Sequence, residues 1–147
     1  MTTESVAPET AAAATPDVAG TVRRLRETFA SGRTRSVEWR KQQLEALERM
    51  MNENEGAITE ALEKDLGRSP FEAWLADIAS TAGEAKDAAK NVKKWMRRKY
   101  RLLEMSQLPG RGWVEYEPYG TVLIIGAWNF PFVLTLGPAV GAIAAGN

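Results

Sequence analysis

Apolar residues recur every three or four positions from Val18 to about Trp95, the spacing that predicts amphipathic helices. The first helix has its start signature at Thr15-Pro16-Asp17, where Thr15 caps the helix and Pro16 takes its first position. Gly32 is placed to end it. Its apolar positions are Val18, Val22, Leu25 and Phe29.

Two further helices follow the same pattern. Ser36 is placed to cap the second, in which a charged stripe faces water opposite the apolar one. The third is shorter, and Gly67 is placed to end it in a left-handed conformation. The inward positions are Val37, Leu44, Leu47 and Met51 in the second helix and Ile58, Ala61, Leu62 and Leu66 in the third; Arg40, Lys41, Glu45 and Glu48 are the water-facing positions of the second.

A fourth, long helix begins at Ser69-Pro70-Phe71-Glu72, which combines a capping box with a proline at the first helical position. A basic run from Lys90 to Lys99 ends it, and cations at that end gain about 0.3–1 kcal/mol each from the helix dipole. The inward positions are Phe71, Trp74, Ile78, Ala82, Ala85, Ala89, Val92 and Trp95 or Met96.

The pattern changes after Pro109-Gly110. Residues 113–117 alternate apolar and polar side chains, which predicts a half-buried strand. Residues 121–125 are apolar and mostly β-branched, which is typical of a strand buried on both faces of a parallel sheet. An apolar helix then runs to Gly146, kinked or restarted at Pro138, with Leu134, Val140, Ile143 and Ala144 among its apolar residues.

These elements predict an α/β fold in four segments. Residues 1–15 form a disordered tail, 16–101 an amino-terminal helical layer, 102–120 a strand and connecting segment, and 121–147 the first strand–helix unit of a Rossmann-like domain. A parallel strand needs a neighbour, and only residues 113–117 are available to the strand at 121–127. We therefore expect the polypeptide to be an incomplete fold that finishes its sheet with something else.

The composition excludes most familiar catalytic centres. The sequence has no Cys and no His, so a thiol nucleophile, a disulfide framework and a thiolate or imidazole metal site are all absent, and no metal is expected. The net charge is zero, which gives no reason to expect a polyanionic partner. Residues 1–15 lack the basic residues of a targeting peptide, so the cytoplasm is the expected location.

One turn has the placement of a functional site. A predicted buried strand runs into Gly126-Ala127-Trp128-Asn129-Phe130-Pro131, and a helix follows; ligands bind at such strand ends in open α/β sheets. Gly126 lets the backbone approach a ligand, and the Asn129 amide nitrogen can donate to a developing oxyanion. The residues alone favour the simpler interpretations, namely Asn129 as the helix cap, Gly126 as a bend and the aromatic residues as packing groups.

The order of residues in this motif is more specific than its position between a strand and a helix. The stretch from Glu117 to Phe132, EPYGTVLIIGAWNFPF, and that from Gly137 to Asn147, GPAVGAIAAGN, closely resemble the aldehyde dehydrogenase superfamily. Its members share a P-x-G turn, a W-N-F/Y-P turn and a helix closing in A-x-x-x-G-N. The upstream helices are also similar to that family, so the resemblance covers roughly residues 17–147; the residues that carry it there are Trp39, Leu44, Leu47, Asp65, Gly67, Glu72 and Asp77.

The resemblance implies an incomplete aldehyde dehydrogenase fold with NAD or NADP as cofactor. Asn129 matches the asparagine whose amide stabilises the thiohemiacetal oxyanion of the family. The backbone that matches the nicotinamide side of the cofactor site is Ile124, Ile125, Gly126, Ala127 and Trp128. Gly126-Ala127 and the short amino terminus are most similar to the class 3 branch, which oxidises fatty or aromatic aldehydes and is usually dimeric; this implies an aldehyde substrate and a homodimer.

The family's nucleophilic Cys, general-base Glu and ribose-binding Lys have no counterpart up to Asn147. We therefore expect the complete enzyme to oxidise an aldehyde to a carboxylic acid, and this chain alone to be inactive. Two other functions remain open from the residues. Residues 118–147 carry no charge and are long enough for a membrane anchor, and the basic stretch Lys90–Arg101, with Trp95 and Tyr100, is a candidate nucleic-acid surface. Interrupting glycines and prolines argue against stable membrane insertion, and the acidic residues elsewhere argue against nucleic acid.

Overall fold

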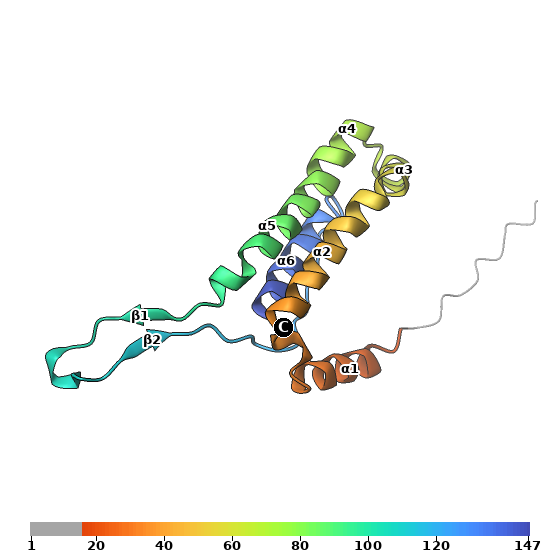
Figure 1. Ribbon diagram of the computed structural model, residues 1–147. Coiled ribbons are helices and arrows are strands. Elements are labelled where there is room, and N and C mark those ends of the chain that lie inside the picture. Colours follow the sequence, from red (N-terminus) through yellow and green to blue (C-terminus); the bar gives the residue numbers. More distant parts are fainter. Residues whose placement is uncertain (1–15) are drawn as a thin grey trace, which may run out of the picture.

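The computed structural model describes residues 16–147, so the tail predicted for residues 1–15 lies outside the described residues. The molecule is a layer of helices with a hairpin projecting from one end (Figure 1). The longer elements are α1 (Val18–Ala30), α2 (Val37–Glu53), α3 (Glu55–Leu66), α5 (Ser80–Trp95) and α6 (Val133–Ala145). The shorter ones are α4 (Pro70–Ala73), the π-helical η2 (Trp74–Ala79), the 3-10 turns η1 (Arg33–Arg35) and η3 (Met105–Gln107), and the strands β1 (Lys99–Arg101) and β2 (Gly112–Val114).

The predicted caps of the second and fourth helices are confirmed. The Ser36 hydroxyl accepts a hydrogen bond from the Trp39 N–H at 3.0 Å. The Ser69 hydroxyl accepts from the Glu72 N–H, and the Glu72 carboxylate accepts from the Ser69 N–H, which completes the capping box. These bonds from Ser69 hold the pKa of Glu72 below its ordinary value, because they favour the charged carboxylate.

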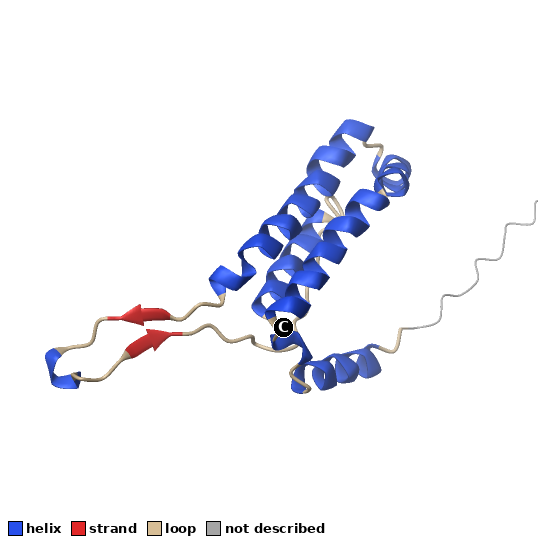
Figure 2. Ribbon diagram, in the orientation of Figure 1, coloured by secondary structure: helices blue, strands red, loops and turns tan. Residues whose placement is uncertain are grey.

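The core lies where α2, α5 and α6 run side by side (Figures 1 and 2). Alanines on α5 let the neighbouring helices approach closely, because they carry only a methyl group. Most of the predicted inward stripe of the long helix is confirmed, but Phe71, Trp74 and Trp95 are 67%, 40% and 46% exposed. The two buried clusters are Leu44, Ala85, Ala88, Ala89, Val92, Val140 and Ala144, and Met51, Ile58, Leu62, Ala73, Ile78 and Ala82.

Arg40 was expected to face water and is instead buried, with 5% of its surface exposed. Its Nε donates to the Thr34 carbonyl at 2.9 Å, and its Nη1 donates to the Ala144 carbonyl at 3.1 Å in the last turn of α6. The last carbonyls of a helix lack hydrogen-bond partners within the helix and carry partial negative charge. A guanidinium supplies both the hydrogen-bond donors and the positive charge that stabilise them. Burial lowers the pKa of Arg40 from its ordinary value. Helical periodicity cannot predict this contact, since α6 arrives from the far end of the chain.

Three helices end next to glycines with positive φ. Gly32, Gly67 and Gly146 have φ of 76°, 64° and 92°; all three were predicted to end a helix, and the left-handed conformation was predicted for Gly67. The start of α1 differs from the prediction, because the Asp17 carboxylate accepts from the Gly20 N–H and the helix begins at Val18. Thr15, the predicted cap, lies outside the described residues.

Replacing Gly67 with alanine should destabilise the protein by about 1 kcal/mol, since a Cβ strains the left-handed backbone more than alanine stiffens the unfolded chain. No atom lies within 4 Å of that Cβ, so the cost is conformational. Gly83→Ala, inside α5 and equally open, is the matched control and should stabilise by about 0.5–1 kcal/mol. Urea unfolding measures the change in the free energy of unfolding for both variants. Changes of the same sign in the two variants would contradict this account.

The strand predicted at residues 113–117 is present but shorter. β2 pairs antiparallel with β1, and Tyr100 lies opposite Trp113 in the register. β1 corrects the prediction that the helical layer extends to residue 101: the long helix ends at Trp95, and Lys99–Arg101 enter the hairpin. Arg98 is held over the Trp113 ring at 4.7 Å and bonded to the Glu115 carboxylate at 2.8 Å, contacts that favour the extended chain here.

The strand predicted at 121–127 does not form in the described chain, where these residues belong to no helix or strand. Leu123 and Ile125 are 84% and 85% exposed, so the prediction of burial on both faces is also wrong. The reason is the one the sequence raised: a central strand requires a ladder partner, and β2 pairs with β1 instead. The helical anchor over 118–147 is not formed either, and no helix within residues 16–147 has the length and apolarity needed to cross a membrane.

Candidate active site

The functional turn was predicted at Gly126–Pro131; in the structure the turn comprises residues 128–132, which connect the segment 121–127 to α6, and a buried carboxylate holds it. Asp77 is fully buried, and its Oδ1 accepts hydrogen bonds from the N–H groups of Phe132 and Val133, both at 3.0 Å. These groups belong to the first turn of α6, whose N–H groups have no partner within the helix. Asp77 therefore caps α6 from another helix.

Arg68 connects the same carboxylate to the other end of the turn. One guanidinium nitrogen, Nη1, donates to Asp77 Oδ2, and the other, Nη2, donates to the backbone carbonyl of Asn129. The guanidinium also lies over the Phe130 ring, 4.0 Å from its centroid. A planar group with several fixed donors is suited to joining a carboxylate and a carbonyl in this way.

The local sequence explains why both charged residues reach the turn. Arg68 stands between the left-handed Gly67, which ends α3, and Ser69, which caps α4, so its side chain leaves a tight corner. Asp77 lies in η2, where the helix widens to π geometry and both Asp77 and its neighbour Ile78 are buried. Neither residue was predicted for the site from charge or spacing; Asp77 was noted only as a point of family resemblance.

Asn129 does not cap the following helix, so that interpretation is wrong. The N-cap position is Phe132, and the capping oxygen comes from Asp77. Asn129 is exposed, and within residues 16–147 its side-chain amide has no hydrogen-bond partner. The backbone of the turn is thus fixed from outside, and the Asn129 amide keeps both of its N–H donors.

The five residues predicted to line the cofactor divide between two sides of the segment. Ile125 and Trp128 are each 85% exposed, and Ala127 is exposed as well. Ile124 points the other way and lines an almost entirely apolar pocket with Phe29, Trp39 and Ile143. Gly126 packs against α6 so closely that a Cβ there would lie 2.0 Å from Thr135 Oγ1. An added methyl group would therefore push the segment away from the helix.

The two ends of the motif are joined as well. The Asn147 side-chain oxygen accepts from the Gly120 N–H at 2.8 Å, and its nitrogen donates to the Ala142 carbonyl at 3.2 Å. Gly120 has a φ of 113°, which other residues rarely adopt. The P-x-G turn before the segment and the G-N end of α6 are thus in direct contact, which places residues 121–132 along one side of α6.

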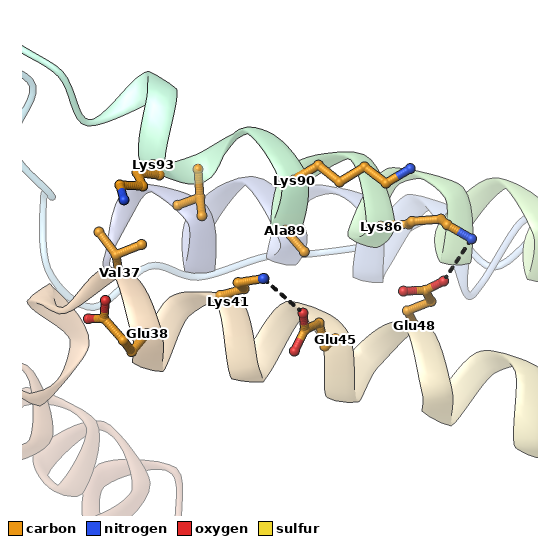
Figure 3. A pocket seen from close by; sticks show the side chains of 10 residues that line it. Val37, Glu38, Lys41, Glu45, Glu48, Lys86, Ala89, Lys90 and Lys93 are labelled. Carbon is orange, nitrogen blue, oxygen red and sulfur yellow. Dashed lines mark ion pairs between the residues drawn. The ribbon is translucent and has the colours of Figure 1, made fainter.

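A second concave surface has no comparable geometry. The groove between α2 and α5 is lined by lysines and glutamates that pair with one another, Lys41 with Glu45 at 3.5 Å and Lys86 with Glu48 at 3.4 Å (Figure 3). Such partly exposed pairs contribute about 0–1 kcal/mol each. Within the described part of the chain, no three His, Cys, Asp or Glu side chains gather to hold a metal ion. The groove is consistent with a solvated helix face.

Comparison with known proteins identifies the family of the chain. A model of the aldehyde dehydrogenase family matches residues 1–147. Aldehyde dehydrogenase family 3 member I1, chloroplastic, from Arabidopsis thaliana is 46% identical over 123 residues, 84% of this chain and 22% of that protein. The dimeric NADP-preferring aldehyde dehydrogenase of Rattus norvegicus is 43% identical over 134 residues, 88% of this chain and 29% of that protein.

A solved structure, the substrate-bound state of Staphylococcus aureus AldH, superimposes with a TM-score of 0.85 at 35% identity and covers 90% of this chain and 29% of its own. The predicted fold class is confirmed by this match. The resemblance to the class 3 branch is confirmed by relatives named as family 3 members at 42–46% identity. The chain spans roughly a quarter of the length of the relatives it matches, and it belongs to the aldehyde dehydrogenase family.

Proposed function

We propose that this chain supplies part of the active site of an NAD(P)-dependent aldehyde dehydrogenase. In this proposal the Asn129 amide donates a hydrogen bond to the oxygen that becomes negative in the reaction. The observation that carries it is the turn itself: Arg68 and Asp77 hold its backbone, and the Asn129 side chain, free of any capping duty, remains available. Holding the backbone that carries a neutral donor lowers the reorganisation needed when charge develops on the substrate.

The reaction is the oxidation of an aldehyde to a carboxylic acid. Attack of a nucleophile on the carbonyl converts its oxygen to an oxyanion, and the role of Asn129 is to stabilise that charge. This chain has no Cys, so it does not provide the thiolate of the family. In this proposal the segment Ile124–Trp128 forms one wall of the cofactor site; the support is that Ile125 and Trp128, which precede Asn129 in the sequence, are exposed apolar side chains of the kind that line a site for a flat ring. NAD(P)+, when bound, accepts the hydride from the substrate.

The remaining assignments rest on the relatives. A relative named dimeric and NADP-preferring supports a homodimer and the use of NADP or NAD. Family 3 relatives support an aldehyde as substrate, of the fatty or aromatic kind that the resemblance implies. We propose the cytoplasm as the location of the protein; one relative, from Arabidopsis thaliana, is named chloroplastic.

A domain exchange tests the function. Residues 17–147 replace the matching region of the rat dimeric NADP-preferring relative, and this chimera supplies the groups that the chain lacks. We expect aldehyde-dependent NAD(P)H formation, followed by absorbance, from the chimera and none from the 147-residue chain, because the covalent route needs a thiol.

The control is the unmodified rat enzyme, assayed with the same series of aldehydes and both cofactors. A chimera that is folded and dimeric but inactive would contradict the proposed function. Turnover by the 147-residue chain itself would contradict the assignment of the nucleophile to another part of the protein.

A further inference from the structure

We propose that Arg68 and Asp77 act as a positioning pair for catalysis: they fix the turn that carries Asn129 and so set the direction of its amide. This inference rests on the function proposed for Asn129 and extends it to two residues that touch neither substrate nor cofactor. Arg68 lies in the connection between α3 and α4, and Asp77 lies in η2, so both are far from the turn in sequence and in direct contact with it in space.

The contacts bracket the turn. Arg68 bonds the Asn129 carbonyl at its beginning, and Asp77 bonds the N–H groups of Phe132 and Val133 at its end. Between these points Pro131 has a fixed φ and no N–H to donate. Rotation of the Asn129 peptide would break the bond to Arg68, so the bond restricts the direction in which the Asn129 side chain leaves the backbone.

Burial strengthens the pair. Asp77 is fully buried and the Arg68 side chain is 14% exposed, so water competes little for the bonds that the Asp77 carboxylate accepts, whereas the bond from Arg68 to the Asn129 carbonyl lies at the exposed edge of the pair. The guanidinium is fixed further by the Phe130 ring beneath it. By contrast, Arg98 makes an ion pair and an aromatic contact of the same kind in the exposed hairpin, where its side chain is 53% exposed. Arg98 therefore offers a matched control for the same substitution.

The first test is amide hydrogen exchange by NMR on the full 147-residue chain. In Arg68→Ala, the N–H groups of Phe132 and Val133 should exchange about tenfold faster or more, because Asp77 loses the charged partner that orders it. The signal of the Asn129 side-chain amide should shift as its backbone is released. The exchange rate of the Val92 N–H in the core should stay within about twofold of the wild-type rate. In Arg98→Ala the exchange rates of the Phe132, Val133 and Val92 N–H groups should all stay within the same limit.

The second test is a double-mutant cycle in the chimera. Arg68→Ala should lower kcat about tenfold or more with little change in KM, since misplacing a catalytic group affects the transition state most. In an Asn129→Ala background the same substitution should change kcat less than about twofold, because the group that it positions is already absent. A residue that only stabilises the fold would lower activity equally in both backgrounds.

Two results would overturn the pair's role: unchanged exchange of the turn amides in Arg68→Ala, or equal losses of kcat in the two backgrounds. The failure of the proposed function has a different signature, because Asn129→Ala alone would then leave kcat unchanged. In that case the exchange data would still show whether Arg68 and Asp77 hold the turn, but the pair would have no role in catalysis.

Discussion

Replacing Asn129 with alanine in the chimera should lower kcat about 10²–10³-fold, the usual loss when one oxyanion donor is removed. The Asn129 amide has no hydrogen-bond partner within residues 16–147, so the substitution breaks no contact of the fold there. Thermal stability should therefore stay the same, and KM should change little, because the interaction gains its strength as charge develops. Steady-state kinetics and a melting curve on the same preparation measure both quantities.

Asn91→Ala is the matched control. Asn91 is an asparagine on α5 whose amide bonds only Asp87, four residues earlier on an exposed face. Its loss should leave kcat within about twofold, since surface substitutions away from a site are nearly neutral. A fall of less than about threefold for Asn129→Ala would argue against a role in stabilising the oxyanion.

The largest loss of stability should follow from Asp77→Asn. A neutral amide at this position turns N–H donors toward Arg68, leaves the guanidinium without its counter-ion and weakens the cap of α6. Breaking a buried ion pair by removing one partner costs roughly 3–5 kcal/mol. We expect the lower end of that range, because Arg68 can move toward solvent, and urea unfolding of the chain measures it.

The same chemical change at an exposed pair provides the comparison. Glu48 pairs with Lys86 at 3.4 Å on the helix surface, where the lysine is 58% exposed (Figure 3). Glu48→Gln should change the free energy of unfolding by about 0–1 kcal/mol. If Asp77→Asn and Glu48→Gln lower the free energy of unfolding equally, burial does not make the loss of the Asp77–Arg68 ion pair more costly than the loss of an exposed pair.

The sequence predicts the parts of this fold that depend on neighbours along the chain. The capping box at Ser69, the cap at Ser36, the helix end at Gly32 and the left-handed Gly67 each need only a few adjacent residues, and all are confirmed. The burial of Arg40 could not be predicted, because one of its two partner carbonyls, that of Ala144, lies at the end of α6. The strand at 121–127 failed for a similar reason, since its formation depends on a ladder partner rather than on its own β-propensity.

The candidate site was predictable only in part. The W-N-F-P motif identifies Asn129 as a candidate, and its role stays a prediction. The spacing of residues along the sequence does not indicate which side chains hold the turn that carries Asn129. Nothing in the sequence distinguishes Arg68 from the other basic residues. The π-helical turn around Asp77 interrupts the 3.6-residue period from which buried positions are predicted. A functional group and its supports lie together here only because α4, η2 and α6 meet in space.

The unpaired segment at residues 121–127 has a practical consequence for handling the protein. No residue from Pro118 to Asn147 is charged, residues 121–125 are β-branched except for Leu123, and Leu123 and Ile125 are exposed in a segment that belongs to no helix or strand. Such stretches recruit strands from other molecules when nothing shields them, which leads to fibrils or precipitates. Concentrated solutions of this chain should therefore be prone to intermolecular β-assembly, and a charge introduced at the exposed Leu123 is the natural gatekeeper.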